Sequence, residues 1–289
     1  MTILKIIHMS DFFTGVLEYD YLRNAVLAAL LASISCGIIG SYIIARRMVF
    51  ISGGITHASF GGIGLGYYLG INPVLGAVIF SILSALGIRL AEKHTQIRED
   101  SAIGILWSLG MAIGIIFIFL TPGYAPNLMT YLFGSILTVG ISDLMLMAGL
   151  ALVTILVFYA FYRTILFVAF DEEYARSHNA PVEAVNYLLL VLIALAIVLH
   201  IRVVGIILVI SFLTIPQTTA NLYANDLRKI IFLSISLSFI GSILGLIASF
   251  YLNIPSGATI IFVFVLIFLV ARFFKYLDTK FKRRQKLID

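Results

Sequence analysis

Charged residues are scarce in this sequence. Of its 289 residues, 11% are Asp, Glu, Lys or Arg and 61% are hydrophobic, and the mean hydropathy is +1.10. Soluble domains carry roughly a quarter charged residues, so these few charges could not cover the surface of a water-soluble protein. Lipid must be the solvent for most of the chain. No polar segment of domain size interrupts the apolar runs, which favours one membrane domain.

Cysteine pairs and enzyme motifs are also absent. Cys36 is the single cysteine, which excludes a disulfide framework and leaves either a small buried side chain or a metal ligand. No lysine precedes Ser or Thr, so a GxxxxGK[ST] phosphate loop is missing, as are HExxH and GxSxG. The chain is therefore not expected to be an enzyme, and any ATP would be hydrolysed on another subunit. Asp143 and Glu183, near the ends of apolar runs, are too few for a typical ion-coupled carrier.

Long apolar runs predict the fold class. Crossing ~30 Å of hydrocarbon takes about 20 apolar residues. The sequence thus predicts an all-α, polytopic integral membrane bundle of eight or nine transmembrane helices, some short or broken. Residues 130–139 are too short to cross and are expected to form a half-helix or re-entrant piece. The candidate spans are 21–45, 53–70, 73–91, 101–120, 141–163, 182–200, 203–221, 229–251 and 255–272.

Basic residues indicate the orientation. With the C-terminus inside and nine spans, all but three of the 19 Lys and Arg residues fall on the cytoplasmic side. The outer exceptions are Lys5, Arg23 and Arg202. This placement predicts that 46–52, 92–100, 164–181 and 222–229 are inner and 121–129 outer. A basic tail beside a span favours a cytoplasmic, lipid-facing segment over nucleic-acid binding.

The predicted organisation has three parts. Residues 1–20 form an N-terminal interfacial segment, and Asp11, Glu18 and Asp20 exclude a cleavable signal peptide there. Residues 21–272 form a single transmembrane domain, and 273–289 a basic cytoplasmic tail.

A glycine-rich stretch, residues 46–73, carries the first motif. Small residues recur every four positions (Gly54, Ala58, Gly62, Gly66 and Gly70), which on a helix allows another backbone to come close. His57 lies in register with Gly53, Gly61 and Gly64, so it is expected to face a tightly packed helix or an aqueous slot. Imidazole is a common ligand for zinc, manganese and iron. The alternative is a histidine bonded to a neighbouring carbonyl.

Two further stretches stand out. In residues 165–185 the acidic run beginning at Asp171 suits the first turn of a short helix, and Asn179 can adopt a left-handed cap. That helix is either a docking surface or an interfacial connector. In residues 203–229, Pro216 followed by Gln217 and Thr218 indicates either an ordinary kink or a broken helix lining a solute path.

Taken together, these segments resemble the permease subunits of zinc, manganese and iron ABC importers, from about residue 20 to residue 272. The matching segments are RRMVFISGGITHASFGGIGLGYYLG, EDSAIGILWSLGMAIGIIFI, YLFGSIL, FDEEYARSHNAP, VVGIILVISFLTIPQTTANLYA and IPSGATI.

The resemblance implies a type II ABC importer-like fold in the cell (inner) membrane and a homodimer with the metal path along its axis. It also implies a cytoplasmic ABC ATPase dimer and an extracytoplasmic metal-binding protein as partners. The cargo would be a divalent metal ion, with no cofactor bound by this chain. The segment 165–181 would be the coupling helix, with Phe170, Asp171, Glu172 and Ala175 at the matching positions. Gly53, Gly61, Pro216, Gln217 and Thr218 would border the path.

One position departs from the family pattern. Members usually carry Asp four residues before the histidine, in GDxxSH, and this chain has Gly53 in SGGITH. An Asp and a His at this spacing share one helical face and form a natural ligand pair. Without the carboxylate, three alternatives remain open. Zinc or iron is favoured, or the ion passes with less direct contact, or the ligands lie elsewhere, with Asp143 and His200 as candidates.

Two alternatives remain open. A permease for a chelated metal, siderophore or cobalamin has a similar architecture but would not need His57. A membrane enzyme or scaffold without a transport role would not copurify with an ATPase.

Overall fold

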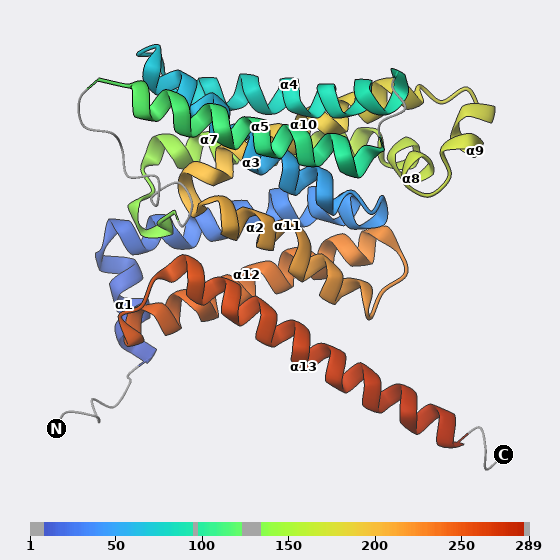
Figure 1. The fold of residues 1–289 in the computed structure, drawn as a ribbon. Helices are drawn as coiled ribbons and strands as arrows, with labels where there is room; N and C mark the ends of the chain where they lie inside the picture. The colour runs from blue at the N-terminus through green and yellow to red at the C-terminus, as the bar shows by residue number, and fades with distance from the viewer. Residues whose placement is uncertain (1–8, 95–97, 123–133, 286–289) are drawn as a thin grey trace.

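The computed structural model describes residues 9–94, 98–122 and 134–285, and in this part of the chain the regular structure is entirely helical (Figure 1). The elements are α1 (Met9–Glu18), α2 (Asp20–Ala45), α3 (Val49–Tyr68), α4 (Pro73–His94), α5 (Glu99–Leu120), the 3-10 turn η1 (Ile136–Thr138), α7 (Ile141–Ala160), α8 (Tyr162–Phe170), α9 (Glu172–Ser177), α10 (Val182–Val204), α11 (Ile206–Asn221), α12 (Leu227–Leu252) and α13 (Ser256–Gln285).

Each of the nine predicted spans contains a helix, which confirms the all-α membrane bundle. Among the described residues, seven helices are long and apolar enough to cross a membrane: α2, α4, α5, α7, α10, α12 and α13. The other two are α3, which is rich in glycine and hydroxyl residues, and α11, which has only 16 residues. Helices of that kind can lie at membrane depth where protein surrounds them.

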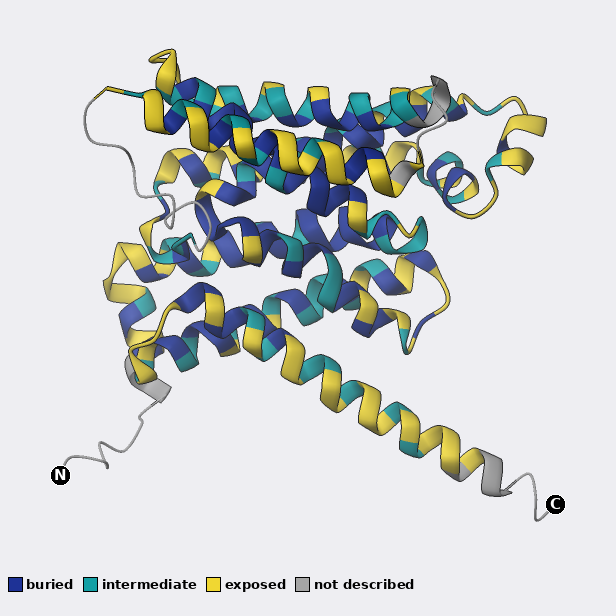
Figure 2. Cartoon of the chain, viewed as in Figure 1, coloured by how far each residue is buried: buried dark blue, intermediate teal, exposed yellow. Residues whose placement is uncertain are grey.

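The core lies around α2 and α10. In their most apolar windows 72% and 67% of residues are buried, against 22% in α5 and in α13 (Figure 2). Helix α2 contacts α7, α11 and α12, while α4 packs on α10 and α3. A helix buried on all sides needs no polar face, and neither does a helix that faces lipid. Helices that are apolar all round therefore occur both at the centre and at the periphery of the bundle.

Helix α3 is held between α4 and α5 by backbone contact. A Cβ on Gly62 would overlap the carbonyl group of Gly76 in α4, and one on Gly66 would lie 2.7 Å from the Cα of Pro73. Toward α5, a Cβ on Gly110 would lie 2.5 Å from the Cα of Ala58. Small residues permit this spacing, and the predicted close-packing stripe of α3 is confirmed. Gly70, with φ +67°, then ends the helix.

Of the two alternatives at Pro216, an ordinary kink or a broken helix, the structure contradicts the broken helix. Helix α11 continues through this proline, and the discontinuity lies at Gly205, whose φ of 82° and ψ of 162° separate α10 from α11. This backbone conformation is open mainly to glycine, and the backbone of Gly134 packs directly against it. The chain also turns at Phe161, so α7 ends before the predicted limit of 163 and α8 begins.

Residues 130–139 were expected to form a half-helix or re-entrant piece. Their first part, 130–133, lies outside the described residues, as do most of 121–129, residues 1–8 and residues 286–289. The described part is an irregular segment with the short turn η1, whose Ile136 is buried and which contacts α2, α10 and α13. No half-helix is present over 134–139.

We predict that Gly62→Ala lowers stability, because the added methyl group has no space between α3 and α4. Overpacking of this kind costs about 1–3 kcal/mol. A Cβ on Gly104, in α5, would meet nothing within 4 Å, so Gly104→Ala is the matched control. Thermal unfolding in detergent should show a lower midpoint for the first variant only. Equal midpoints would contradict the packing described for α3.

Candidate functional site

The side chain of His57 projects from α3 toward α5 and stacks on Trp107. The ring centroids are 4.1 Å apart and the rings are within 7° of parallel. The imidazole is partly buried, and its Nδ1 is buried without a hydrogen-bond partner among the described residues. A buried polar atom in this state calls for an explanation, such as an ordered water, an ion, strain or a functional role. The ring of His57 is thus held in place by Trp107, while its Nδ1 has no hydrogen-bond partner among the described residues.

The glycines beside His57 differ in their surroundings. Gly53, one turn earlier, has open space where a side chain would lie, since nothing approaches within 4 Å of a Cβ there. Gly61, one turn later, would place a Cβ 2.9 Å from the carbonyl oxygen of Gly110 and from the ring of Phe80. Of the two predicted path positions, only Gly53 borders open space. Gly61 is a close-packing position.

The other candidate ligands are already committed. His200 is fully buried, with Nε2 3.0 Å from Ser35 Oγ and Nδ1 2.6 Å from the carbonyl oxygen of Ala196. Asp143 accepts from the backbone N–H of Gly140 and lies 3.2 Å from Arg202. Cys36 is buried in the core. No group of three His, Cys, Asp or Glu side chains suited to a metal ion occurs among the described residues.

Gln217 compensates for the proline in α11. Pro216 lacks the N–H that would bond to the carbonyl of Phe212, and Gln217 Nε2 donates to that oxygen at 2.8 Å. The same Nε2 lies 2.8 Å from the carbonyl oxygen of Cys36 in α2. Thr218 bonds only to the carbonyl of Thr214, one turn earlier. The motif therefore joins α11 to α2, and it keeps the helix continuous.

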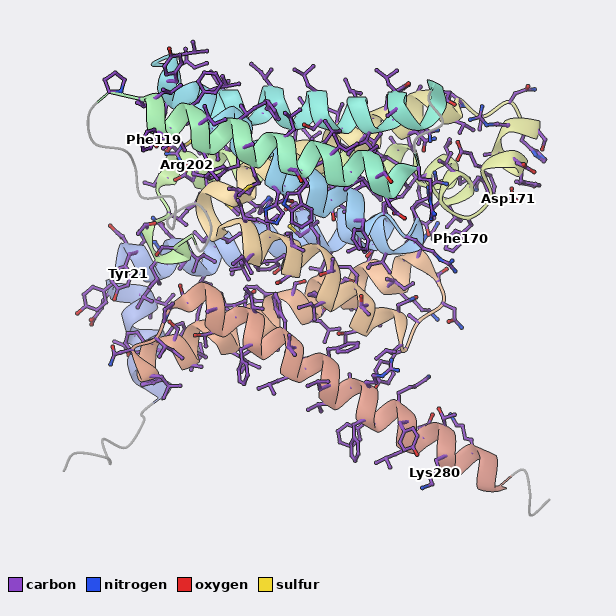
Figure 3. The ribbon with its side chains drawn as sticks, viewed as in Figure 1. Tyr21, Phe119, Phe170, Asp171, Arg202 and Lys280 are labelled. Carbon is purple, nitrogen blue, oxygen red and sulfur yellow. The ribbon has the colours of Figure 1, made fainter. Side chains whose placement is uncertain are left out.

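The segment with the acidic run forms a short helix at one end of the bundle, far from Arg202 and Phe119 (Figure 3). Asp171 caps α9 by accepting from the N–H of Tyr174 at 2.8 Å. Asn179, with φ 55°, takes the predicted left-handed conformation after the helix. Phe170 is 62% exposed, whereas Ala175 is fully buried. Phe170 is thus available to a partner, and Ala175 packs α9 onto the bundle.

Glu172 ties α9 to three other elements. Its carboxylate lies 3.2 Å from Arg46 at the end of α2, 3.5 Å from Arg89 in α4 and 3.1 Å from Arg176. Asn186 in α10 also donates to it at 3.1 Å. Burial alone would raise the pKa of Glu172, but the adjacent Arg46 and Arg176 outweigh burial and hold this pKa below its ordinary value. Glu172 is therefore ionised at neutral pH.

Sequence reasoning missed Arg46 and Arg89 as partners of Glu172. The distribution of basic residues predicts that both arginines are cytoplasmic. That distribution is the one sequence signal that points to them as partners of a cytoplasmic carboxylate. Which of several arginines meets which carboxylate depends on the packing of α2, α4 and α10, because 126 and 83 residues separate Glu172 from the two arginines along the chain. No local pattern specifies such pairs.

The comparisons with known proteins agree on one family. A model described as the ABC 3 transport family matches residues 18–275. An uncharacterized membrane protein of Synechocystis, slr2045, is 42% identical over 273 residues, which cover 94% of this chain and 97% of that protein. The manganese transport system membrane protein MntC of Halalkalibacterium halodurans is 36% identical over 267 residues, covering 92% and 91%.

One solved structure is similar over nearly the whole chain. PsaBC from Streptococcus pneumoniae, determined in complex with a Fab, superposes with a TM-score of 0.82 at 34% identity. The similarity covers 91% of this chain and 94% of the matched chain. The helical arrangement in Figure 1 is thus a known permease fold.

We predict that Gln217→Met destabilises the bundle, because the carbonyl of Phe212 loses its donor in a low-dielectric interior. An unsatisfied buried group costs about 1–3 kcal/mol. Adding Pro216→Ala should recover part of the loss, since alanine restores the backbone N–H. Thermal unfolding in detergent measures both effects. Thr218→Val, which removes only an exposed local bond, is the control, and absence of rescue would contradict the compensation.

Proposed function

The chain belongs to the ABC 3 transport family, the permease subunits of metal ABC importers, and on that premise we propose that it provides the membrane path for a divalent transition-metal ion. It is a non-enzymatic, multi-pass protein of the cell membrane. The observation that carries the proposal is His57, whose Nδ1 is buried without a partner beside the open position at Gly53.

Two observations point to different metal ions. Relatives with about a third of their residues identical are named for manganese transport, which supports manganese. The donor chemistry of this chain supports zinc or iron, because imidazole suits these ions while manganese prefers carboxylate and water oxygens. We propose that His57 contacts the ion transiently and that a second copy supplies a second imidazole along a homodimer path.

The segment 165–181 is proposed to couple this path to a cytoplasmic ABC ATPase dimer, with an extracytoplasmic metal-binding protein delivering the ion. Support comes from the exposed Phe170 next to a helix that is anchored to the bundle through Glu172. On this proposal residues 21–272 form the permease domain, 1–20 an interfacial segment and 273–289 a cytoplasmic tail. A rearrangement of the ATPase would move α9, and Arg46 would transmit the displacement to α2.

We predict that His57→Phe abolishes metal accumulation. Phenylalanine retains an aromatic ring against Trp107 but has no ligand nitrogen, so the variant separates ligation from packing. The measurement is the Mn, Fe, Zn and Co content of cells lacking the gene and complemented with each variant in metal-limited medium. The wild-type gene should restore one metal selectively, and this metal is the cargo.

Full restoration by His57→Phe would overturn the ligand role and favour a chelated substrate that needs no imidazole. No change in any metal on deletion would contradict metal import itself. Gly104→Ala is the control for expression and folding, because its methyl group enters open space.

We predict that Glu172→Gln uncouples ATP hydrolysis from transport. Charge-assisted hydrogen bonds of this kind are worth about 1.5–3 kcal/mol each, and their loss releases α9 from Arg46 and Arg89. In proteoliposomes containing the complete importer, the ions moved per ATP hydrolysed should fall while the ATPase stays bound. Glu173→Gln, which changes the adjacent exposed carboxylate, should preserve the ratio. An unchanged ratio in Glu172→Gln would refute the coupling role.

A further inference from the structure

The last helix is longer than a membrane span. Helix α13 has 30 residues, which at 1.5 Å per residue makes it about 45 Å long, against ~30 Å of hydrocarbon. Figure 1 shows its C-terminal part projecting beyond the bundle, and Figure 3 places Lys280 on this projection. The transition from apolar to basic residues begins at Arg272, where the helix leaves its apolar run.

A groove lies between the projection and the connection from α11 to α12. Its volume is about 410 Å³, and it is lined by Leu222, Arg272, Lys275, Tyr276, Thr279 and Lys280. The five residues from α13 recur at intervals of three and four, so they share one face of the helix. Three of the lining residues are cations and none is acidic.

Tyr223, next to the lining residue Leu222, contacts α13 beside this groove. Its hydroxyl donates to the carbonyl of Ala271 at 2.6 Å, and Lys275 Nζ lies 5.5 Å from the centre of its ring. The two acidic residues nearest to the groove in the sequence have other partners. Asp278 pairs with Lys282 at 2.9 Å, and Asp226 accepts from the N–H groups of Arg228 and Lys229. The positive charge of the groove is therefore not neutralised by these residues.

The projection also carries exposed aromatic residues outside the groove. Phe273 and Phe274 are 59% and 61% exposed, and Tyr276 at the groove edge is 61% exposed (Figure 2). Aromatic side chains are enriched where the hydrocarbon meets the headgroups. Basic residues at that level attract anionic lipids. Aromatic and basic residues on neighbouring faces of one helix fit the headgroup layer better than they fit either water or hydrocarbon.

We propose that the groove formed by Arg272, Lys275, Tyr276, Thr279 and Lys280 binds the headgroup phosphate of an anionic phospholipid. The cations neutralise the phosphate, the exposed hydroxyl of Tyr276 donates a hydrogen bond to one of its oxygens, and the aromatic residues lie against the acyl chains. The hydroxyl of Thr279 already donates to the carbonyl of Lys275 at 2.8 Å, so Thr279 only lines the groove. Such a lipid fastens α13 to the connection between α11 and α12. The site does not depend on the transported ion or on ATP.

The test is lipid occupancy in the purified full-length chain. The protein is reconstituted in nanodiscs of phosphatidylcholine with a minor fraction of phosphatidylglycerol, and bound lipid is measured by native mass spectrometry. We expect retention of phosphatidylglycerol, which Lys275→Gln and Lys280→Gln each weaken by about fivefold. Lys275→Arg, which keeps the charge, should restore retention.

The matched control is Arg98→Gln. Arg98 is also basic and is 86% exposed on its side chain, but it pairs with Asp100 at the start of α5. The same loss in this variant, or none in the groove variants, overturns the proposal. Displacement of the lipid by millimolar inorganic phosphate would overturn a lipid-specific site in favour of a free-phosphate site. Unchanged lipid retention with loss of the copurifying ATPase would instead assign the groove to a protein partner.

Discussion

Hydrocarbon cannot hydrogen-bond, and this constraint orders the interior of the protein. Each polar group in the bundle must find a partner within the protein or pay a desolvation cost of several kcal/mol, of the order of 2–7 for an amide or hydroxyl. The Nε2 group of Gln217 meets the requirement by bonding two carbonyls, and His200 does so by contacts at both ring nitrogens. Several buried side-chain atoms of the described residues lack a partner, Gln217 Oε1 and His57 Nδ1 among them. Of these two, only His57 Nδ1 is a nitrogen of the kind that ligates transition metals, which is why it bears on function.

The helices could be predicted from the sequence because their length and apolarity are local properties. The small-residue stripe beginning at Gly54 also indicated correctly where backbones meet. The break could not be placed, because Pro216 looks like a helix breaker and nothing local reveals that Gln217 replaces the missing donor. Gly205 breaks the helix instead, at a point where the backbone of Gly134 packs closely against it. Neither the continuous helix at Pro216 nor the break at Gly205 could be read from the local sequence pattern.

The two ends of the bundle are connected by rigid elements. Arg46 follows α2 directly and holds Glu172 of α9, and within three residues the chain enters α3, which carries His57. Helix α3 is fixed against α4 and α5 by backbone contact, so it cannot deform locally without separating from them. The contacts of Glu172 with Arg46 therefore link α9, through the end of α2, to the start of α3. This connection is the structural basis for the proposed coupling role of Glu172.

The open space at Gly53 could hold a larger side chain. A carboxylate there would share a helical face with His57, and among the described residues no atom comes within 4 Å of a Cβ at this position. With glycine, the proposed path would offer the ion imidazole and water, and imidazole suits manganese less well than carboxylate does. Weak coordination is compatible with transport, since an ion that must leave the path cannot be held tightly. The missing carboxylate therefore bears on which ion is selected more than on whether ions pass.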